Sequence, residues 1–175
     1  LDAPDRPESR ALWLLKGHAV EATHLINGDD VIQAATHAIG GAGKVFVFGT
    51  GDDDLRARGF SQRLAMIGIV AMHHPDLAHL SAQLAFAGRG DALVLLSEHG
   101  RSPALPRVAQ HMHEQGGVVI SRTRHSGNAL RHRTDSPLAV IAHDDAAHVQ
   151  SLLYQSAAQH MLDDLFLRLC ESDEA

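Results

Sequence analysis

The sequence lacks the features that several protein classes require. It contains a single cysteine, Cys170, which excludes an intramolecular disulfide framework and suits a reducing compartment. Its apolar runs fall far short of the roughly 20 residues that a membrane-spanning helix needs. The chain also does not open with the charged and then apolar segments of a secretory signal. We therefore expect a cytoplasmic protein with no membrane partner.

Lysine is almost absent, and the basic residues are never clustered. Only Lys16 and Lys44 are lysines, the arginines are scattered, and the formal net charge is -6. Binding along a nucleic-acid backbone requires clustered Lys and Arg side chains, so we do not expect this chain to bind DNA or RNA by itself. The fourteen histidines are many for this length and are interpreted mainly as a bias in genome composition.

The chain is long enough for one domain with its own core. It has 175 residues, of which 45% are hydrophobic. Residues 1–8 contain two prolines and three acids and are interpreted as a leader or linker, followed by one domain over residues 9–175. Apolar residues at helical spacing predict a helix over 9–26. A second helix should start at Asp29 or Asp30, either of which can cap it.

From residue 44 onward, short apolar runs alternate with helical patterns. Continuous apolar runs of this length are typical of strands buried on both faces. The runs cover residues 44–49, 69–72, 92–96, 118–120 and 138–141. Helices are predicted over 53–67, 77–86, 103–115 and 145–169, with a short one over 128–133. This alternation predicts a doubly wound α/β domain, a three-layer α-β-α sandwich around a five-stranded parallel sheet.

Two turns that follow predicted strands are unusually polar. The first runs from Gly49 to Asp54 (GTGDDD) and the second from Ser97 to Pro103 (SEHGRSP). Ligands of such sheets bind beyond the carboxyl ends of the strands. In the second turn, the hydroxyls of Ser97 and Ser102 and the free N–H groups of the next helix would form an anion cradle, and Arg101 would clamp a phosphate. The alternative is an ordinary serine-capped helix after a strand.

These turns carry a resemblance to a known family. Ser97-x-His99-Gly100-x-Ser102 resembles the S-x-S-G-x-T turn of sugar isomerase (SIS) domains, and GTGDD at 49–53 resembles their G-x-G-x-S turn. The segments 76–79, 90–91, 134–139 and 159–166 are similar to those of the SIS domain in RpiR-type transcriptional regulators. The resemblance extends over residues 9–169 and implies a SIS, flavodoxin-like fold with an extra N-terminal helical pair.

The resemblance also implies a function. It points to the effector domain of a regulator of carbohydrate metabolism that binds a sugar phosphate, forms a homodimer or higher homo-oligomer, and has no catalytic residue, metal or cofactor. DNA would be contacted only through an N-terminal helix-turn-helix domain that this chain does not contain. The implied ligand-binding residues are Gly49, Thr50, Gly51, Asp52, Asp53, Ser97, His99, Gly100, Arg101 and Ser102.

The sequence departs from the family pattern at three of these positions. In the second turn His99 replaces the middle serine and Ser102 replaces the final threonine, and in the first turn Asp53 stands where the family usually has a phosphate-binding serine. Asp52, Asp53 and Asp54 suit a helix N-terminus but repel a phosphate. Either Arg101 offsets them, or the ligand sits differently, or the pocket has degenerated into a module kept for dimerisation.

Two further functions remain open from the residues. The fold also serves aldose–ketose isomerases of phosphosugars, which need a carboxylate or imidazole base, and Glu98, His99 and His143 are the candidates. A metal site is the other alternative, with ligands from the segment HHPDLAH over 73–79, although Asp76 is also placed to cap the following helix. Arg122 and Arg124 are expected to follow the fourth strand, where they would meet either the ligand or surface acids.

Overall fold

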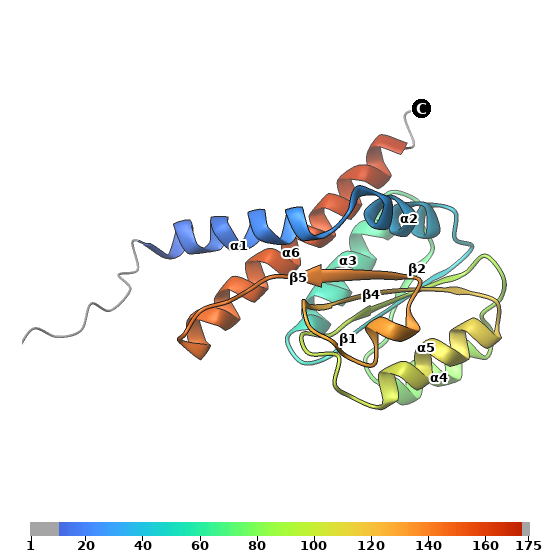
Figure 1. Cartoon of the computed structure of the whole chain (residues 1–175). Coiled ribbons are helices and arrows are strands. Elements are labelled where there is room, and N and C mark those ends of the chain that lie inside the picture. Colours follow the sequence, from blue (N-terminus) through green and yellow to red (C-terminus); the bar gives the residue numbers. More distant parts are fainter. Residues whose placement is uncertain (1–10, 173–175) are drawn as a thin grey trace, which may run out of the picture.

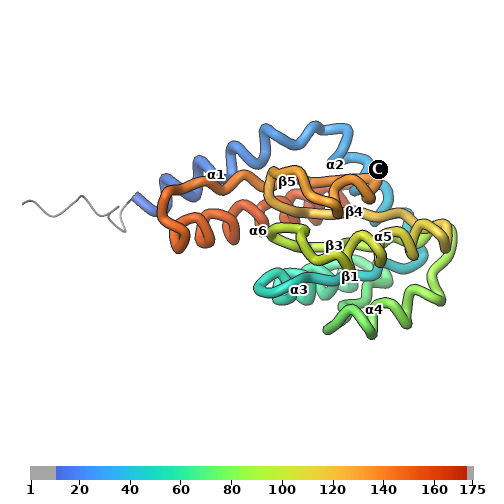
Figure 2. The backbone as a smooth tube through the Cα atoms, turned by 60° about the horizontal axis from the view of Figure 1, so that its bottom comes forward, coloured from blue at the N-terminus to red at the C-terminus, as the bar shows by residue number. Residues whose placement is uncertain are grey.

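The computed structural model describes residues 11–172, and the interpretation of residues 1–8 as a leader lies outside this range. Five parallel strands form one sheet in the order β2-β1-β3-β4-β5. The strands are β1 (Val45–Gly49), β2 (Ala71–His73), β3 (Ala92–Leu96), β4 (Val118–Arg124) and β5 (Ser136–Val140). The order reverses between β1 and β3, and Figure 2 shows β1, β3, β4 and β5 following one another across the molecule.

Helices cover both faces of the sheet. They are α1 (Leu12–Ile26), α2 (Asp29–Gly40), α3 (Asp53–Met66), α4 (Leu77–Leu84), α5 (Ala104–Glu114) and α6 (Ala147–Ser172), with a short 3-10 helix, η2 (Arg131–Arg133). One apolar core joins alternate strand residues to α1, α2, α3 and α6, and a second joins the other face to α4 and α5. The predicted three-layer α-β-α fold is therefore confirmed, and Figure 1 shows α4 and α5 on the face opposite α6.

The N-terminal helical pair is joined to the edge strand β5. The Asn27 side chain accepts from the N–H of Ala139 and donates to its carbonyl, both at 2.8 Å. The Thr23 hydroxyl makes the same kind of contact with Ile141, at 2.9 Å and 3.2 Å. These side chains bond to backbone groups at a sheet edge, where no further strand follows. The contacts place α1 beside α6 and near the end of β5.

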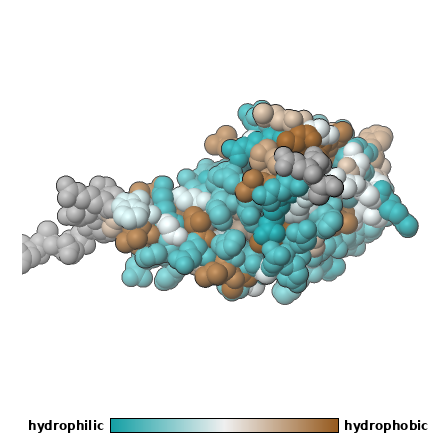
Figure 3. Space-filling view, turned by 90° about the horizontal axis from the view of Figure 1, so that it is seen from above, coloured by the Kyte–Doolittle hydropathy of each residue, from teal (hydrophilic) through white to brown (hydrophobic). Residues whose placement is uncertain are grey.

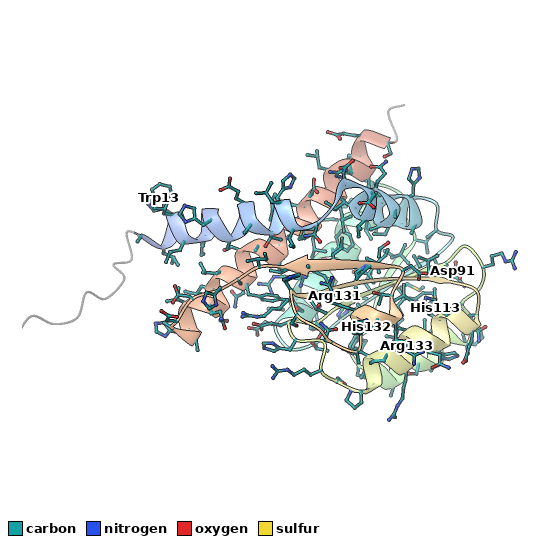
Figure 4. The ribbon with its side chains drawn as sticks, viewed as in Figure 1. Trp13, Asp91, His113, Arg131, His132 and Arg133 are labelled. Carbon is teal, nitrogen blue, oxygen red and sulfur yellow. The ribbon has the colours of Figure 1, made fainter. Side chains whose placement is uncertain are left out.

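α1 extends beyond the body of the sheet alongside the first part of α6 (Figures 1 and 4). Leu12 and Leu15 of α1 pack on the core. Trp13 is 72% exposed, and Figure 4 shows it on the side of α1 that faces away from α6. On the face shown in Figure 3, apolar groups form separate patches within a mostly hydrophilic surface. None of the described helices has the length and hydropathy to cross a membrane.

Several expected details differ in the structure. β4 continues four residues past the predicted run, to Arg124, so Arg122 and Arg124 lie within the strand and not after it. The predicted run at 69–72 becomes a short strand that starts only at Ala71. The cap of α2 is Gly28, and neither aspartate of its first turn makes a capping hydrogen bond. Asp76 does cap α4, because its carboxylate accepts from the N–H of His79 at 2.7 Å.

Candidate functional site

A cavity of about 320 Å³ opens at the carboxyl edge of the sheet, where the strand order reverses. Such a switch point is the expected ligand position in a doubly wound sheet. The turns after β1 and β3 form two sides of the cavity, and α6 forms the third. Its lining consists of Thr50, Gly51, Asp52, Asp53, Ser97, Glu98, His99, Arg101, Ser102, Ser151, Tyr154 and Gln155.

The turn after β1 depends on two glycines. A Cβ atom on Gly49 would lie 2.2 Å from the carbonyl oxygen of Asp53, so only glycine lets α3 begin this close to β1. Gly51 has a φ of 57°, in the left-handed region that favours glycine. The hydroxyl of Thr50, between them, donates to Ser97 Oγ at 3.0 Å. The two turns are therefore joined directly at the base of the cavity.

The turn after β3 is folded around the side chain of Ser97. The Ser97 hydroxyl accepts from the N–H of Gly100 at 3.2 Å as well as from Thr50. Gly100 has a φ of 59°, and a Cβ there would meet Asn128 Oδ1 at 2.7 Å. In the described part of the chain, the N–H groups of His99, Arg101 and Ser102 donate to no protein acceptor. These free donors belong to residues that line the cavity, next to the start of α5.

Asp53 forms a buried ion pair at the base of the cavity. Arg122 is fully buried, and its Nη2 contacts Asp53 Oδ1. The Tyr154 hydroxyl donates to Asp53 Oδ2 at 2.7 Å, and Arg122 Nη1 donates to the carbonyl of Ala158 at 3.0 Å. Burial raises the pKa of the Tyr154 hydroxyl well above its usual value, so it stays protonated as a donor. The pair and its hydrogen bonds connect α3, β4 and α6.

The other acidic side chains near the cavity differ in their partners. Asp54 contacts His73 Nε2 at 2.6 Å, on the side of β2, and does not line the cavity. Glu98 accepts from Arg124 Nε at 2.9 Å. Asp52 remains exposed, and among the described residues its carboxylate has no cationic partner within 4.0 Å. The three aspartates of the first turn therefore do not act as one negative cluster.

Most of the expected ligand-binding residues meet at this cavity. Thr50, Gly51, Asp52, Asp53, Ser97, His99, Arg101 and Ser102 all line it. Gly49 and Gly100 do not, and they act instead by allowing the close approach of backbone and side chains described above.

Sequence reasoning missed Ser151, Tyr154 and Gln155, which α6 contributes from about 50 residues beyond the second turn. It also missed the role of Arg122, which was expected at the ligand edge or in a surface ion pair. One signal was available in the sequence, because Arg122 stands between two small polar residues, Ser121 and Thr123, directly after an apolar run. All three residues are buried in the structure. Tyr154 is also the only tyrosine of the chain.

The histidines of the segment 73–79 do not converge on one point. His74 Nδ1 lies 2.9 Å from His79 Nδ1, whereas His73 contacts Asp54. Burial, followed by the nearby His79 and His73, lowers the pKa of His74 to about 4. Within residues 11–172, no group of three or more His, Cys, Asp or Glu side chains is arranged to hold a metal ion.

The fold and the cavity together define a doubly wound α/β domain with two polar, glycine-containing turns at its switch point. A family model, the SIS domain, matches residues 38–168. The chain belongs to the SIS domain family.

Known relatives include a transcriptional regulator. The chain is 28% identical over 155 residues to the uncharacterized HTH-type transcriptional regulator YfhH of Escherichia coli. The aligned residues cover 89% of this chain and 55% of the regulator. It is also 29% identical over 92 residues to the bifunctional protein glk of Paraburkholderia xenovorans, covering 53% of the chain and 14% of that protein. The chain thus spans about half the length of the first of these relatives and less of the second.

Solved structures with the same fold include a transcription factor and an enzyme. The Vibrio vulnificus NanR protein, complexed with ManNAc-6P, superimposes with a TM-score of 0.84 at 16% identity, covering 93% of this chain and 62% of that one. The sugar isomerase domain of an RpiR transcription factor from Sphaerobacter thermophilus gives 0.72 at 17%, covering 97% and 99%. A phosphoheptose isomerase from Francisella tularensis gives 0.66 at 22%, covering 91% and 94%. At these identities the likeness shows the fold alone.

Proposed function

We propose that this chain is the sugar-phosphate-sensing effector domain of an RpiR-type transcriptional regulator that acts in the cytoplasm. The observation that carries the proposal is the cavity between the two turns, where hydroxyls, free N–H groups and Arg101 meet. The regulator YfhH and the ManNAc-6P complex of NanR support the class of protein and the class of ligand. Any contact with DNA would be made through a separate helix-turn-helix domain.

The charges around the cavity are compatible with a phosphate. Asp53 was expected to repel one, but its negative charge is balanced by the buried guanidinium of Arg122. The charge of Glu98 is likewise balanced by Arg124, whose Nη2 lies 2.5 Å from Glu98 Oε1. Arg101 is exposed and has no acidic partner within 4.0 Å among the described residues, so it is available to a ligand. The serine-to-aspartate departure therefore does not argue against phosphate binding.

A binding role is favoured over an isomerase role by the state of the candidate bases. Glu98 is the only glutamate that lines the cavity, and its carboxylate is held by Arg124. His143 is exposed and does not line the cavity. His99 is the one candidate left, with half of its side chain exposed. Proton transfer between adjacent sugar carbons needs a base fixed at the sugar, so an isomerase role would rest on His99 alone.

Self-association is part of the proposal. Symmetric homodimers are the commonest assembly of soluble proteins, and Trp13 and Leu14 on α1 expose apolar surface that a second copy would cover. Ligand binding would shift the balance between two dimer arrangements. The route would run from the cavity through Tyr154 to α6, and from α6 to α1, with which it shares the core. Sedimentation velocity with and without ligand tests both statements.

A thermal-shift screen against sugar phosphates tests the proposed function. Free sugars and inorganic phosphate are the controls. A ligand present at about one hundred times its Kd should stabilise the chain by roughly 2.7 kcal/mol, which raises Tm by a few degrees. Each hit is then incubated with the protein and followed by NMR, and interconversion of aldose and ketose would show an isomerase instead. Cooperative melting with no response to any phosphosugar would leave the dimerisation module as the better account.

Variants of the second turn place the response in the cavity. Ser102→Ala and Arg101→Gln should each reduce the ligand-induced shift while leaving the Tm of the free protein almost unchanged. Ser97→Ala should reduce the shift as well, but it also removes the hydroxyl that joins the two turns, so the free protein should lose about 1 kcal/mol. A full response in the Ser102→Ala, Arg101→Gln double variant would place the site elsewhere.

A further inference from the structure

Two opposite charges at the rim of the cavity have no partner in the described part of the chain. Asp52 comes from the turn after β1 and Arg101 from the turn after β3, and both line the cavity. Both residues are exposed. Neither forms a salt bridge with a described residue, and they do not reach within 4.0 Å of each other. The remaining acids of the lining, Asp53 and Glu98, are paired with Arg122 and Arg124.

Asp52 also does not perform the structural task usual for its position. It occupies the N-cap position of α3, where an aspartate normally accepts a backbone N–H of the first turn. Its side chain makes no such capping bond. Arg56 donates to the backbone carbonyl of Asp52 at 3.3 Å and to Asp53 Oδ1 at 3.4 Å, and it forms its ion pair with Asp53 and not with the Asp52 carboxylate. The carboxylate is therefore available to a cation inside the cavity.

We propose that the cavity takes an amino sugar phosphate, whose protonated amine lies at Asp52 and whose phosphate lies at Arg101 and Ser102. This inference rests on the proposed function and narrows its ligand class. A cavity of about 320 Å³ is at the small end of ligand pockets, the size of one small metabolite. A ligand with both charges pairs with Asp52 and Arg101 together. A sugar phosphate without an amine leaves the Asp52 carboxylate beside it unpaired.

Matched pairs of ligands test this directly by isothermal titration calorimetry near neutral pH. The pairs are the 6-phosphates of glucosamine and glucose, galactosamine and galactose, and mannosamine and mannose. The 6-phosphates of the N-acetylated sugars are controls, because they carry an uncharged amide at the position of the amine. In the configuration that binds, the amine should bind about fivefold tighter than the hydroxyl, the effect of one exposed ion pair at low salt. Raising the ionic strength from about 0.02 M to about 0.5 M should shrink the preference.

Variants of the chain test the contributions of Asp52 and Arg101 to binding separately. Asp52→Asn should abolish the preference for the amine, and the affinity for the sugar phosphate that lacks an amine should stay the same or rise, because a carboxylate that repels the phosphate is removed. Arg101→Gln should weaken both ligands by a similar factor. Asp30→Asn is the matched control, because Asp30 is also exposed in the first turn of a helix, α2, but does not line the cavity. It should keep the full preference.

The outcomes distinguish this inference from the proposed function. Equal affinity for amine and hydroxyl, or a preference that persists in Asp52→Asn, overturns the amino sugar assignment and leaves sugar-phosphate sensing in place. Binding of no sugar phosphate at all overturns both.

Discussion

Asp53 and Arg122 are 69 positions apart in the chain and form a buried pair beneath the cavity. The side chain of Arg122 is 0% exposed, and Asp53 is 2% exposed as a residue. Burying two charges is costly even when they are paired, so such a pair is weak evidence of stabilisation by itself. Removing one partner is a different matter, because the remaining charge stays buried without compensation.

Arg122→Met should therefore destabilise the fold strongly. The variant leaves the Asp53 carboxylate buried with the Tyr154 hydroxyl and the more distant Arg56, so we expect a loss of about 3–5 kcal/mol in the free energy of unfolding, measured by urea denaturation. The double variant Asp53→Asn, Arg122→Met should recover much of this loss. Arg63→Met, which breaks a surface pair with Asp163, should cost less than about 1 kcal/mol. Equal losses in Arg122→Met and Arg63→Met would contradict the role of the buried pair.

His74 gives the fold a dependence on pH. It is 2% exposed and stacks on Phe46, and its pKa of about 4 in the folded state lies below the ordinary value of 6.5. Between these two values the unfolded chain binds the proton and the folded chain does not, so stability falls as the pH drops from about 6.5 to 4. The loss due to this group is at most about 3 kcal/mol.

His74→Gln should remove that part of the pH dependence. Urea unfolding of the wild type and the variant at pH values across this window isolates the contribution of His74 from those of the other histidines. His125→Gln, at an exposed position, should follow the wild-type curve. Parallel curves for the wild type and His74→Gln would show that His74 binds its proton equally in both states.

At the scale of helices and strands, prediction succeeded where the pattern was continuous. The buried strands β1 and β3 have only apolar residues and glycine, and their bounds follow from the sequence. β4 was predicted too short because Ser121, Arg122 and Thr123 do not look like strand interior. They are buried because Asp53 and Thr134 provide distant partners for Arg122 and Ser121. Such contacts form only once the sheet has brought the segments together, so no local pattern indicates them.

In the candidate site too, local features were predicted from the sequence and contributions from distant segments were not. Both turns were located from their glycines and hydroxyls, because a turn that joins a buried strand to a helix is a local feature. The wall formed by Ser151, Tyr154 and Gln155 depends on where α6 crosses the sheet edge, which the sequence does not specify. The pairing of Asp53 with Arg122 could likewise not be predicted, because the two residues are 69 positions apart in the chain.

Replacement of two glycines in the β1–α3 unit by alanine should change the stability of the fold in opposite directions. Gly49→Ala puts a Cβ atom 2.2 Å from a backbone oxygen, which cannot move without displacing the start of α3. We expect a loss of at least about 1–3 kcal/mol and a distorted cavity. Gly59 lies inside α3 with nothing within 4 Å of an added Cβ, so Gly59→Ala should gain about 1 kcal/mol. Thermal melting measures both, and a neutral Gly49→Ala would contradict the close approach of β1 and α3.

At the scale of the whole molecule, the sheet, the cavity at its switch point and the helices α6 and α1 are connected. The cavity lies where the strand order reverses, and Tyr154 connects its base to α6. α6 in turn packs with α1, which extends away from the sheet (Figure 1). A change at the cavity thus has a physical path to the N-terminal helix. The central claim is that a sugar phosphate occupies the cavity.

The structure of the chain bound to the sugar phosphate that raises its Tm most would test this claim most directly. We expect the phosphate within hydrogen-bonding distance of Ser102 and Arg101, with the sugar between the two turns and Tyr154 still donating to Asp53. A ligand bound instead in the hollow between α3 and α6 that Phe60, Arg63 and Gln159 line, or at the opposite edge of the sheet, would contradict the proposal.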